Sequence, residues 1–266
     1  MIDARRPAAA GTFYPAESDR LMRAVRDLLG VGAGDGATGP APRAIVAPHG
    51  SLGASGAVTA AAWASVQPGA ERIRRVVLVG PAHGMPFAGV AAPFADAFAT
   101  PLGPLAVDRL AIEAARRFPQ LALSDLPHAN EHTLEVHLPF VQAVLGEPRI
   151  VPLVVGEATD DELVQLVDAL WPAEAEDTLL VVSTDLSRYY DPESARGLDE
   201  ATAQAIERLD AAAIEAEHAC AAGLLRATVR LAAARGLRAS RLALSAHAAT
   251  EEGAAEVIGY GAFAMQ

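Results

Sequence analysis

Three short apolar runs, each ending abruptly in small or polar residues, constrain the fold of this chain more than any other feature. They cover residues 43–47, 75–79 and 178–183. Runs of this length that are rich in valine and bounded by glycine or proline are typical of strands buried on both faces. His49, His83 and Asp185 each follow one of the runs. Ligands of open α/β sheets bind outside the carboxyl ends of the strands, so we expect these three residues to share one site.

The rest of the chain alternates helix-like and strand-like patterns. Helices are predicted over residues 18–29, 57–66, 107–118, 159–170, 198–218 and 224–234, and further strands over residues 90–92, 149–155, 240–245 and 257–264. This alternation predicts an α/β fold with a mostly parallel mixed sheet flanked by helices, and leaves open whether the last two strands join it parallel or antiparallel. A chain of 266 residues can form one large domain or two small ones. Because no low-complexity linker interrupts it, we expect a single domain over residues 1–266.

Composition excludes several classes of partner. The formal net charge is −12 and there is no basic face, so we expect neither nucleic acid nor a membrane surface as a partner. Cys220 is the single cysteine, so no intrachain disulfide can form, which fits the reducing cytoplasm. Arg5, Arg6 and Pro7 interrupt any secretory signal, and no apolar run approaches the ~20 residues of a membrane span. We therefore expect a cytoplasmic protein and leave its oligomeric state open.

The segment between the second and third runs is dense in groups that carry chemistry. It holds His128, Glu131, His132, Glu135 and His137. The spacing H-x-x-E-x-H differs from both zincin-type motifs, so a zinc protease is not indicated. One interpretation is the polar start of a helix, whose acids complement its positive end. The other, which we favour, is that these residues belong to the site.

Two histidines at equivalent strand ends raise the hypothesis of a metal site, since imidazole binds transition metals. The third ligand stays open between Asp185, Cys220, Glu131 and the histidines of residues 128–137. Two histidines with a carboxylate would suggest non-haem iron, and two histidines with a cysteine would suit copper or iron. A hydrolase is the rival interpretation, with Ser183, Ser187, Ser245 and His247 available. No G-x-S-x-G elbow is present, so an α/β-hydrolase is not favoured.

The motifs, taken in order, resemble those of the Memo family (mediator of cell motility; bacterial members are called AmmeMemoRadiSam system protein B). They are A-G-T-F-Y-P at residues 10–15, A-P-H-G at 47–50, G-P-A-H at 80–83, E-H-T-L-E-V-H-L-P-F at 131–140, S-T-D-L-S at 183–187 and G-Y-G-A at 259–262. The string at 131–140 is the most specific of these. The resemblance covers nearly the whole chain.

This resemblance implies a fold similar to that of class III extradiol dioxygenases, with a metal pocket. The metal ligands of the family carry over onto His49, His83 and Cys220, with iron or copper as the ion. The aspartate of its S-x-D motif falls on Asp185, which would support the pocket or receive protons. Glu131 and Glu135 would line the pocket.

The chain departs from the family pattern in ways that bear on chemistry. Arg188 stands where the family has the histidine that matches the acid–base histidine of the dioxygenases. Proton transfer would then fall to His132 or His137, which are nearest in kind. Arg188 cannot act as a base at neutral pH, but it can hold an anionic substrate or a carboxylate.

Three functions follow from these observations. The first is a metal-binding protein that performs redox or dioxygenase-like chemistry on a small molecule. The alternative is a non-catalytic module that binds a ligand or a phosphopeptide, as animal members of the family are associated with phosphotyrosine peptides. A weaker alternative is a metal-dependent hydrolase.

Overall fold

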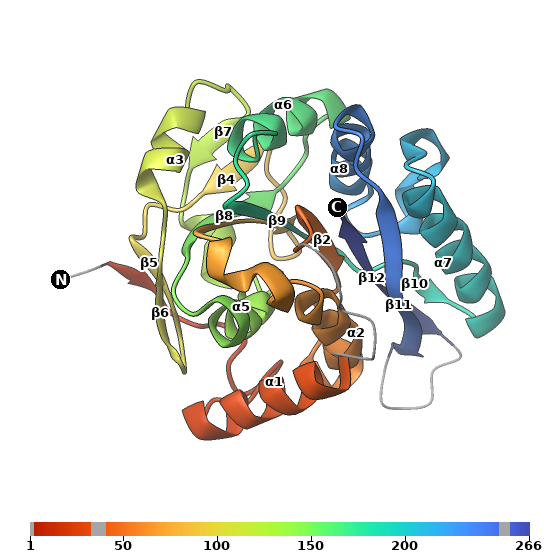
Figure 1. The fold of residues 1–266 in the computed structure, drawn as a ribbon, viewed down its shortest axis with the longest axis horizontal. Helices are drawn as coiled ribbons and strands as arrows, with labels where there is room; N and C mark the ends of the chain where they lie inside the picture. The colour runs from red at the N-terminus through yellow and green to blue at the C-terminus, as the bar shows by residue number, and fades with distance from the viewer. Residues whose placement is uncertain (1–2, 33–40, 250–255) are drawn as a thin grey trace.

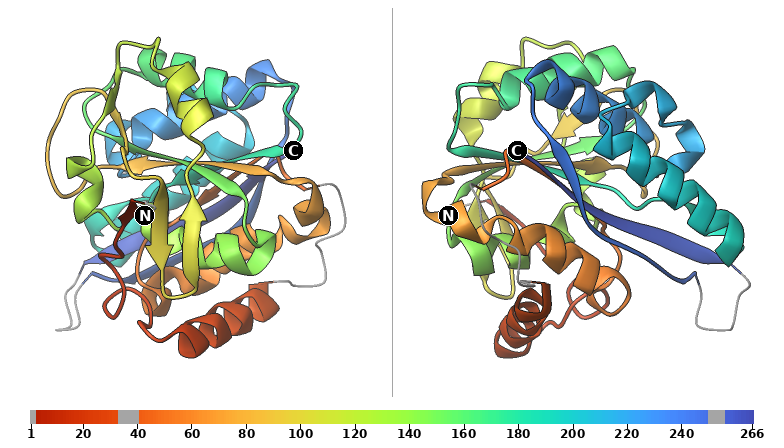
Figure 2. Two further views of the ribbon diagram at one scale, coloured as in Figure 1. Left: turned by 90° about the vertical axis from the view of Figure 1, so that its left-hand side faces the viewer. Right: turned by 45° about the vertical axis from the view of Figure 1, so that its right-hand side comes forward.

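The computed structural model describes residues 3–32, 41–249 and 256–266, and arranges them in three layers with the large sheet between two groups of helices (Figures 1 and 2). The strands are β1 (Ala4–Arg5), β2 (Ala44–Ala47), β3 (Arg75–Pro81), β4 (Val90–Ala92), β5 (Ala97–Thr100), β6 (Gly103–Ala106), β7 (Leu121–Leu123), β8 (Arg149–Val155), β9 (Thr178–Ser183), β10 (Arg188–Tyr190), β11 (Ala239–Ala248) and β12 (Val257–Met265). The α-helices are α1 (Ser18–Gly32), α2 (Leu52–Ala64), α3 (Arg109–Ala115), α4 (Leu126–Ala129), α5 (Leu138–Leu145), α6 (Asp160–Leu170), α7 (Pro192–Glu207) and α8 (Ala222–Ala234). Short 3₁₀ turns include η2 (Glu135–His137) and η4 (Ala216–His218).

The large sheet is mixed, with a parallel centre. Among the described residues its strand order is β10-β12-β2-β9-β3-β8-β4-β7, and β11 pairs with β12. The neighbours β2, β9, β3 and β8 are parallel, whereas β12 joins β2 antiparallel. The predicted fold class, α/β with a mostly parallel mixed sheet flanked by helices, is confirmed.

The register of the central strands brings the ends of the three apolar runs together. Ala47 on β2 lies opposite Ser183 on β9, and Val79 on β3 lies opposite Val182 on β9. Because parallel strands point the same way, the residues that follow them emerge at one edge of the sheet. His49, His83 and Asp185 therefore leave the sheet side by side.

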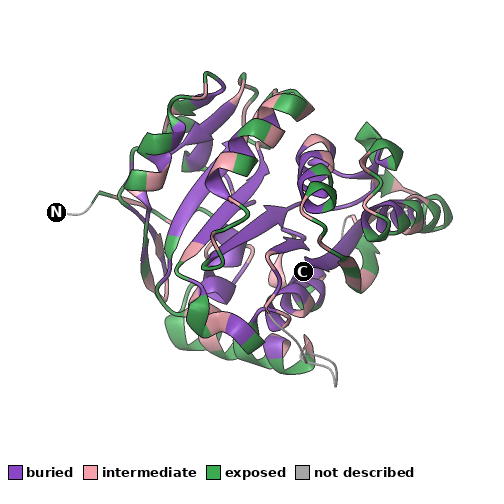
Figure 3. Cartoon of the chain, turned by 45° about the horizontal axis from the view of Figure 1, so that its top comes forward, coloured by how far each residue is buried: buried purple, intermediate pink, exposed green. Residues whose placement is uncertain are grey.

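Helices cover both faces of the sheet. On one face α1 packs on α2, and α5 contacts both; on the other, α6 packs on α8, and α7 packs on β11 and β12 (Figure 2). Figure 3 shows the strands buried in the middle and the exposed residues on the outer faces of the helices. Trp63, Phe140 and Phe263 are among the largest side chains that are fully buried. No described helix combines the length and the apolar character needed to span a bilayer.

The structure corrects the helix predicted over residues 198–218. Helix α7 begins at Pro192, where Asp191 accepts hydrogen bonds from the N–H groups of Glu193 and Ser194. It ends at Glu207, and Leu209 has a positive φ of 55°. A left-handed residue cannot continue an α-helix, so the remaining residues form only short 3₁₀ turns.

Candidate metal centre

His49 lies directly beyond the carboxyl end of β2, and it is fully buried. Pro48 follows the strand, and the backbone N–H of His49 donates to Asp185 Oδ1 at 3.0 Å. On the ring, Nδ1 lies 2.9 Å from Ser183 Oγ. These contacts fix both the backbone and the ring of His49 at this edge of the sheet.

Ser183, the last residue of β9, binds three groups through one hydroxyl. Its Oγ lies 2.7 Å from the carbonyl oxygen of Thr133, 2.9 Å from His49 Nδ1 and 3.0 Å from His137 Nε2. A carbonyl can only accept, so the hydroxyl proton goes to Thr133 and both imidazoles donate to Oγ. The indole N–H of Trp63 then donates to His137 Nδ1 at 3.4 Å. It follows that His49 carries its proton on Nδ1 and has an unprotonated Nε2.

Burial keeps both of these imidazoles neutral. It lowers the pKa of His49 well below 6.5, and the neighbouring histidines lower that pKa further. Burial also lowers the pKa of His137 to about 3. A neutral imidazole with a bare nitrogen is the form that binds metal ions. His49 has such a nitrogen, whereas both nitrogens of His137 are engaged in hydrogen bonds.

The thiol of Cys220 faces His49 Nε2 across 3.5 Å. Its Sγ also accepts the backbone N–H of Asp185 at 3.2 Å and lies 3.4 Å from Thr184 Oγ1. Burial, and then the carboxylate of Asp185, raise the pKa of the thiol to about 11. Cys220 is therefore protonated at pH 7 in the metal-free protein, and a metal ion would have to displace that proton.

His83, just beyond β3, has the same tautomer as His49. Arg188 Nη1 lies 3.1 Å from His83 Nε2. A guanidinium has donors only, so Nε2 accepts and the ring proton is on Nδ1. That nitrogen faces Glu131 Oε1 at 3.8 Å. The lone pair of His83 Nε2 is therefore the one that a metal ion would need, and it accepts the hydrogen bond from Arg188.

Glu131 organises the loop around His83 through backbone hydrogen bonds. Oε2 accepts the N–H groups of His83 and Gly84, and Oε1 accepts those of His132 and Thr133. Burial alone would raise the pKa of Glu131, but these hydrogen bonds, led by those from His83, lower it to about 2. Glu131 is thus a carboxylate whose oxygens are already occupied in holding the loop.

Two clusters of potential ligand atoms meet at His83. Those of His49, His83 and Cys220 lie within 4.8 Å of one another, as do those of His83, Glu131 and His132. In the first cluster both histidines have an unprotonated Nε2 near a thiol, a donor set that suits iron, copper or zinc. In the second, four N–H groups already occupy the carboxylate of Glu131. The first cluster therefore fits a transition metal better.

Comparison with known proteins identifies the family. The family model described as Memo-like protein matches residues 5–264. The chain belongs to the Memo family. A MEMO1 family protein of Aquifex aeolicus (strain VF5) is 34% identical over 215 residues, which cover 77% of this chain and 75% of that relative. A MEMO1 family protein of Aeropyrum pernix is 32% identical over 97% of this chain and 98% of that relative. A solved structure titled uncharacterized protein JW3007 from Escherichia coli K12 covers 82% of this chain and 98% of its own, with 12% identity and a TM-score of 0.49.

The match confirms the Memo-family resemblance that the sequence motifs predicted, and with it the fold that the family shares with class III extradiol dioxygenases. The structure gathers in the first cluster His49, His83 and Cys220, the residues that the sequence resemblance predicted as metal ligands. The role of each residue in this Memo-family chain stays a prediction.

Asp185 lies against the first cluster. Its Oδ2 is 3.5 Å from His49 Nε2 and 3.6 Å from Arg188 Nη2. Burial raises the pKa of this carboxyl group above its usual value, although the hydrogen bond from the backbone of His49 opposes the change. Asp185 is thus placed to exchange a proton with the cluster.

His132 also lies at the cluster, where its ring packs against three other rings. The ring centroids are 5.5 Å from His83, 5.7 Å from His49 and 4.3 Å from Phe13. Burial lowers the pKa of His132 below 6.5, so its ring is neutral at pH 7 and can accept a proton. His137, the other histidine predicted to transfer protons, lies behind His49 and reaches it through Ser183.

Glu135, predicted to line the pocket, instead binds the N-terminal arm. Its buried carboxylate accepts hydrogen bonds from Arg5 Nη1, from the N–H groups of Ala8 and Ala9, and from the hydroxyl of Tyr14. These contacts leave the carboxylate committed to residues 5–14. They also place Phe13 of the same arm against His132.

Sequence reasoning missed the role of Ser183 as the residue that orients both His49 and His137. The rival interpretation treated it as a hydrolase nucleophile, but its proton is given to a carbonyl and both histidines donate to it. Ser245 and His247 lie exposed on β11. The available signal was a serine at the end of a buried strand, beside a strand that leads to a histidine.

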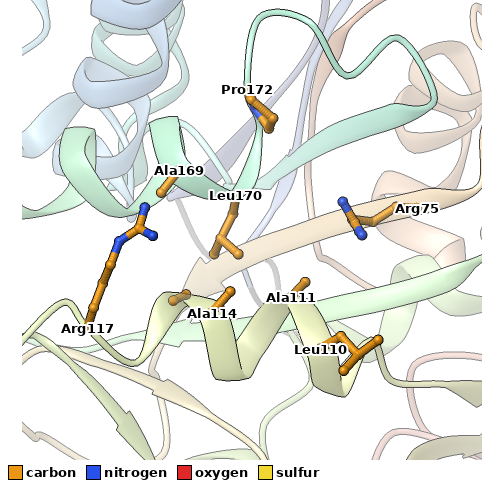
Figure 4. Close-up of a pocket in the computed structure, with 9 residues that line it drawn as sticks. Arg75, Leu110, Ala111, Ala114, Arg117, Ala169, Leu170 and Pro172 are labelled. Carbon is orange, nitrogen blue, oxygen red and sulfur yellow. The ribbon is translucent and has the colours of Figure 1, made fainter.

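Two hollows bear on where a ligand could bind. One of about 660 Å³ is lined by residues 11–17 of the N-terminal arm, by α1 and by residues 51–53. Phe13 lines it and packs on His132, so this hollow borders the cluster. The other, of about 310 Å³, lies between α3 and α6 beside Arg75, the first residue of β3 (Figure 4). It is therefore at the opposite end of the sheet from the cluster.

Proposed function

We propose that this Memo-family protein binds one iron or copper ion through His49, His83 and Cys220 and uses it for redox chemistry on a small molecule. The observation that carries the proposal is the arrangement of the three donors, whose ligand atoms lie within 4.8 Å of one another. In addition, the hydrogen-bond partners of both histidines leave Nε2 unprotonated. Such preset tautomers are what metal-ligating histidines require of their surroundings.

The donor set favours iron or copper over hard cations. Thiolate is a soft ligand and imidazole suits transition metals, whereas magnesium and calcium prefer oxygen. A bound iron or copper ion would supply one-electron chemistry at this edge of the sheet. Three protein ligands leave coordination positions open for a substrate, as in other catalytic sites.

The remaining residues of the site would handle protons and position the ligand. His132 is neutral and partly exposed beside the cluster, so it would take a proton from a bound substrate. Asp185 would hold a proton near the ligands, since burial raises its pKa. Both nitrogens of His137 are already bonded, and we assign it a positioning role. The hollow of about 660 Å³ beside Phe13 is large enough for a small-molecule substrate.

The first experiment is elemental analysis of anaerobically purified protein. We expect about one equivalent of iron or copper in the wild type and its loss in both His49→Ala and Cys220→Ala. Thr228→Ala serves as a control, since Thr228 bonds only to the Leu224 carbonyl of its own helix. A wild-type protein that neither contains metal nor takes up Fe(II) or Cu(I) on titration would refute the proposal.

A second candidate function is a non-catalytic module that binds an anionic ligand or a phosphopeptide. One specific observation favours it, because Arg188 places a guanidinium at the mouth of the cluster with Nε lacking any partner. Binding of a phosphotyrosine peptide to the metal-free protein, lost in Arg188→Ala, would support this function. Unchanged binding in that variant would count against it. The metal-dependent hydrolase has no comparable observation of its own.

A further inference from the structure

We propose that Arg188 and the metal ion compete for the same lone pair on His83 Nε2, and that a ligand bearing a carboxylate relieves this competition. Metal and carboxylate would then bind with positive cooperativity. The inference rests on the proposed metal site and adds the class of ligand that this site prefers.

The competition follows from the hydrogen bonds of Arg188. Its Nη1 donates to His83 Nε2 at 3.1 Å, which is the nitrogen that a metal ion needs. Its Nη2 is 3.6 Å from Asp185 Oδ2, too far for a hydrogen bond, and its buried Nε has no partner. The guanidinium thus depends on His83 for its one good hydrogen bond.

The backbone aims Arg188 at the cluster. Strand β10 pairs with β12, and the register shifts between Arg188 and Tyr190. Within this bulge Tyr189 has a φ of 63°, a left-handed conformation that is costly for an aromatic residue. Bulges redirect side chains near functional sites, and here the bulge holds Arg188 over the mouth of the cluster.

A metal ion on His83 would leave Arg188 in an unfavourable position. The guanidinium would lose its acceptor and would lie beside a second positive charge. Asp185 lies close but makes no hydrogen bond to the guanidinium, because its Oδ2 is 3.6 Å from Nη2 and its Oδ1 accepts the backbone N–H of His49. A carboxylate ligand would supply what is missing, since one oxygen can bind the metal ion while the group pairs with the planar fork of Arg188.

The effect of Arg188 on metal binding therefore depends on whether a carboxylate is bound. Without a carboxylate, Arg188 weakens metal binding, because the ion must first break a charge-assisted hydrogen bond. With a carboxylate, Arg188 strengthens it. Reciprocity requires that the metal ion raise the affinity for the carboxylate by the same factor.

The test is a titration with Co²⁺, followed by the thiolate-to-cobalt charge-transfer absorption that reports on Cys220. Wild type, Arg188→Gln, Arg188→Lys and the control Arg230→Gln are compared with acetate, with the neutral analogue acetamide and with neither. Arg230 pairs with Asp161 on the surface, away from the cluster, so its substitution makes the same change in net charge. Circular dichroism and urea unfolding check that each variant is folded.

Without acetate, we expect Arg188→Gln to bind Co²⁺ about tenfold more tightly than wild type, which is the scale of one charge-assisted hydrogen bond. Acetate should tighten Co²⁺ binding by about tenfold in the wild type and much less in Arg188→Gln. Acetamide should have no effect, Arg188→Lys should be intermediate, and Arg230→Gln should match wild type. Acetate also binds free Co²⁺ in solution, which lowers the apparent Co²⁺ affinity of every variant alike and leaves the comparison between variants intact.

The outcomes separate this inference from the proposed function. Equal Co²⁺ affinity in wild type and Arg188→Gln, or an equal effect of acetate on both, would overturn the competition and leave the metal site standing. Absence of the charge-transfer band in every variant would overturn the metal site and the competition with it.

Discussion

Replacing Ser183 with alanine should remove the hydrogen-bond acceptor that His49 and His137 share. In the wild type, Oγ accepts from His49 Nδ1 and His137 Nε2 and donates to the carbonyl of Thr133. All of these residues are completely buried, so water cannot replace the lost acceptor. Alanine fits the same space on β9 and removes only the hydroxyl.

The expected loss of stability comes from two buried imidazole N–H groups that are left without an acceptor. Each buried donor left without an acceptor costs about 1–3 kcal/mol, so two cost about 2–6 kcal/mol. His49 can recover part of this by moving its proton to Nε2, which lies 3.5 Å from Asp185 Oδ2. We therefore expect the free energy of unfolding to fall by about 2–4 kcal/mol. That same proton shift fills the lone pair needed by a metal ion, so metal affinity should fall by about 10–100-fold.

Urea unfolding measures the first effect and metal titration the second, while NMR of the imidazole nitrogens reads the tautomer of His49 directly. The control is Ser65→Ala, because Ser65 follows α2 directly and its Oγ donates a single hydrogen bond of 2.6 Å to the carbonyl of Ala62 in that helix. This control should lose no more than about 1.5 kcal/mol and keep its metal affinity. A Ser183→Ala protein within about 0.5 kcal/mol of wild type, or one whose His49 keeps its proton on Nδ1 and its full metal affinity, would refute the reasoning.

Three further predictions concern other parts of the molecule. Glu135→Gln leaves the nearly buried Arg5 without its anion, so the free energy of unfolding measured in urea should fall by about 3 kcal/mol or more. The control Glu113→Gln, in an exposed pair, should cost less than about 0.5 kcal/mol. Equal effects would contradict the anchoring role of Glu135. Burial lowers the pKa of His128 to about 4, so as the pH falls His128 is protonated in the unfolded chain before it is protonated in the folded protein. The free energy of unfolding should therefore fall as the pH drops from about 6.5 to 4. Urea unfolding of His128→Gln at several pH values should show a shallower decline, and an unchanged slope would refute this. Phe13→Ala should expose His132 and merge the hollow of the N-terminal arm with the cluster. Chemical modification of His132 by diethyl pyrocarbonate should then be faster than in wild type. An unchanged rate would show that Phe13 does not shield His132.

Much of the fold could be predicted because its central strands are buried on both faces. The runs at 43–47, 75–79 and 178–183 correspond to β2, β3 and β9 within two residues at either end. The small sheet of β1, β5 and β6 was not predicted. Its strands are two to four residues long, too short for an alternating pattern to stand out.

The site was predictable only where a residue follows a strand directly. His49 and His83 were found in this way, since strand ends converge in a parallel sheet. The choice of Cys220 came from the family resemblance, because a cysteine before a helix has no distinctive spacing. The contact of Arg188 with His83 depends on the bulge in β10, and a bulge of this kind leaves no mark in the sequence pattern.

The position of β12 in the sheet sets an order on how the site can form during synthesis. This strand is made after the other described strands of the large sheet, yet it lies between β10 and β2. Its residues Phe263–Met265 pair with Ala44–Val46 of β2. Until it emerges from the ribosome, the edge of β2 has unpaired backbone groups and is open to pairing with other chains. The nascent chain therefore depends on a late event to protect the strand that leads to His49. The third proposed ligand, Cys220, is likewise made long after His49 and His83, so the three donors can meet only when most of the chain has been synthesised.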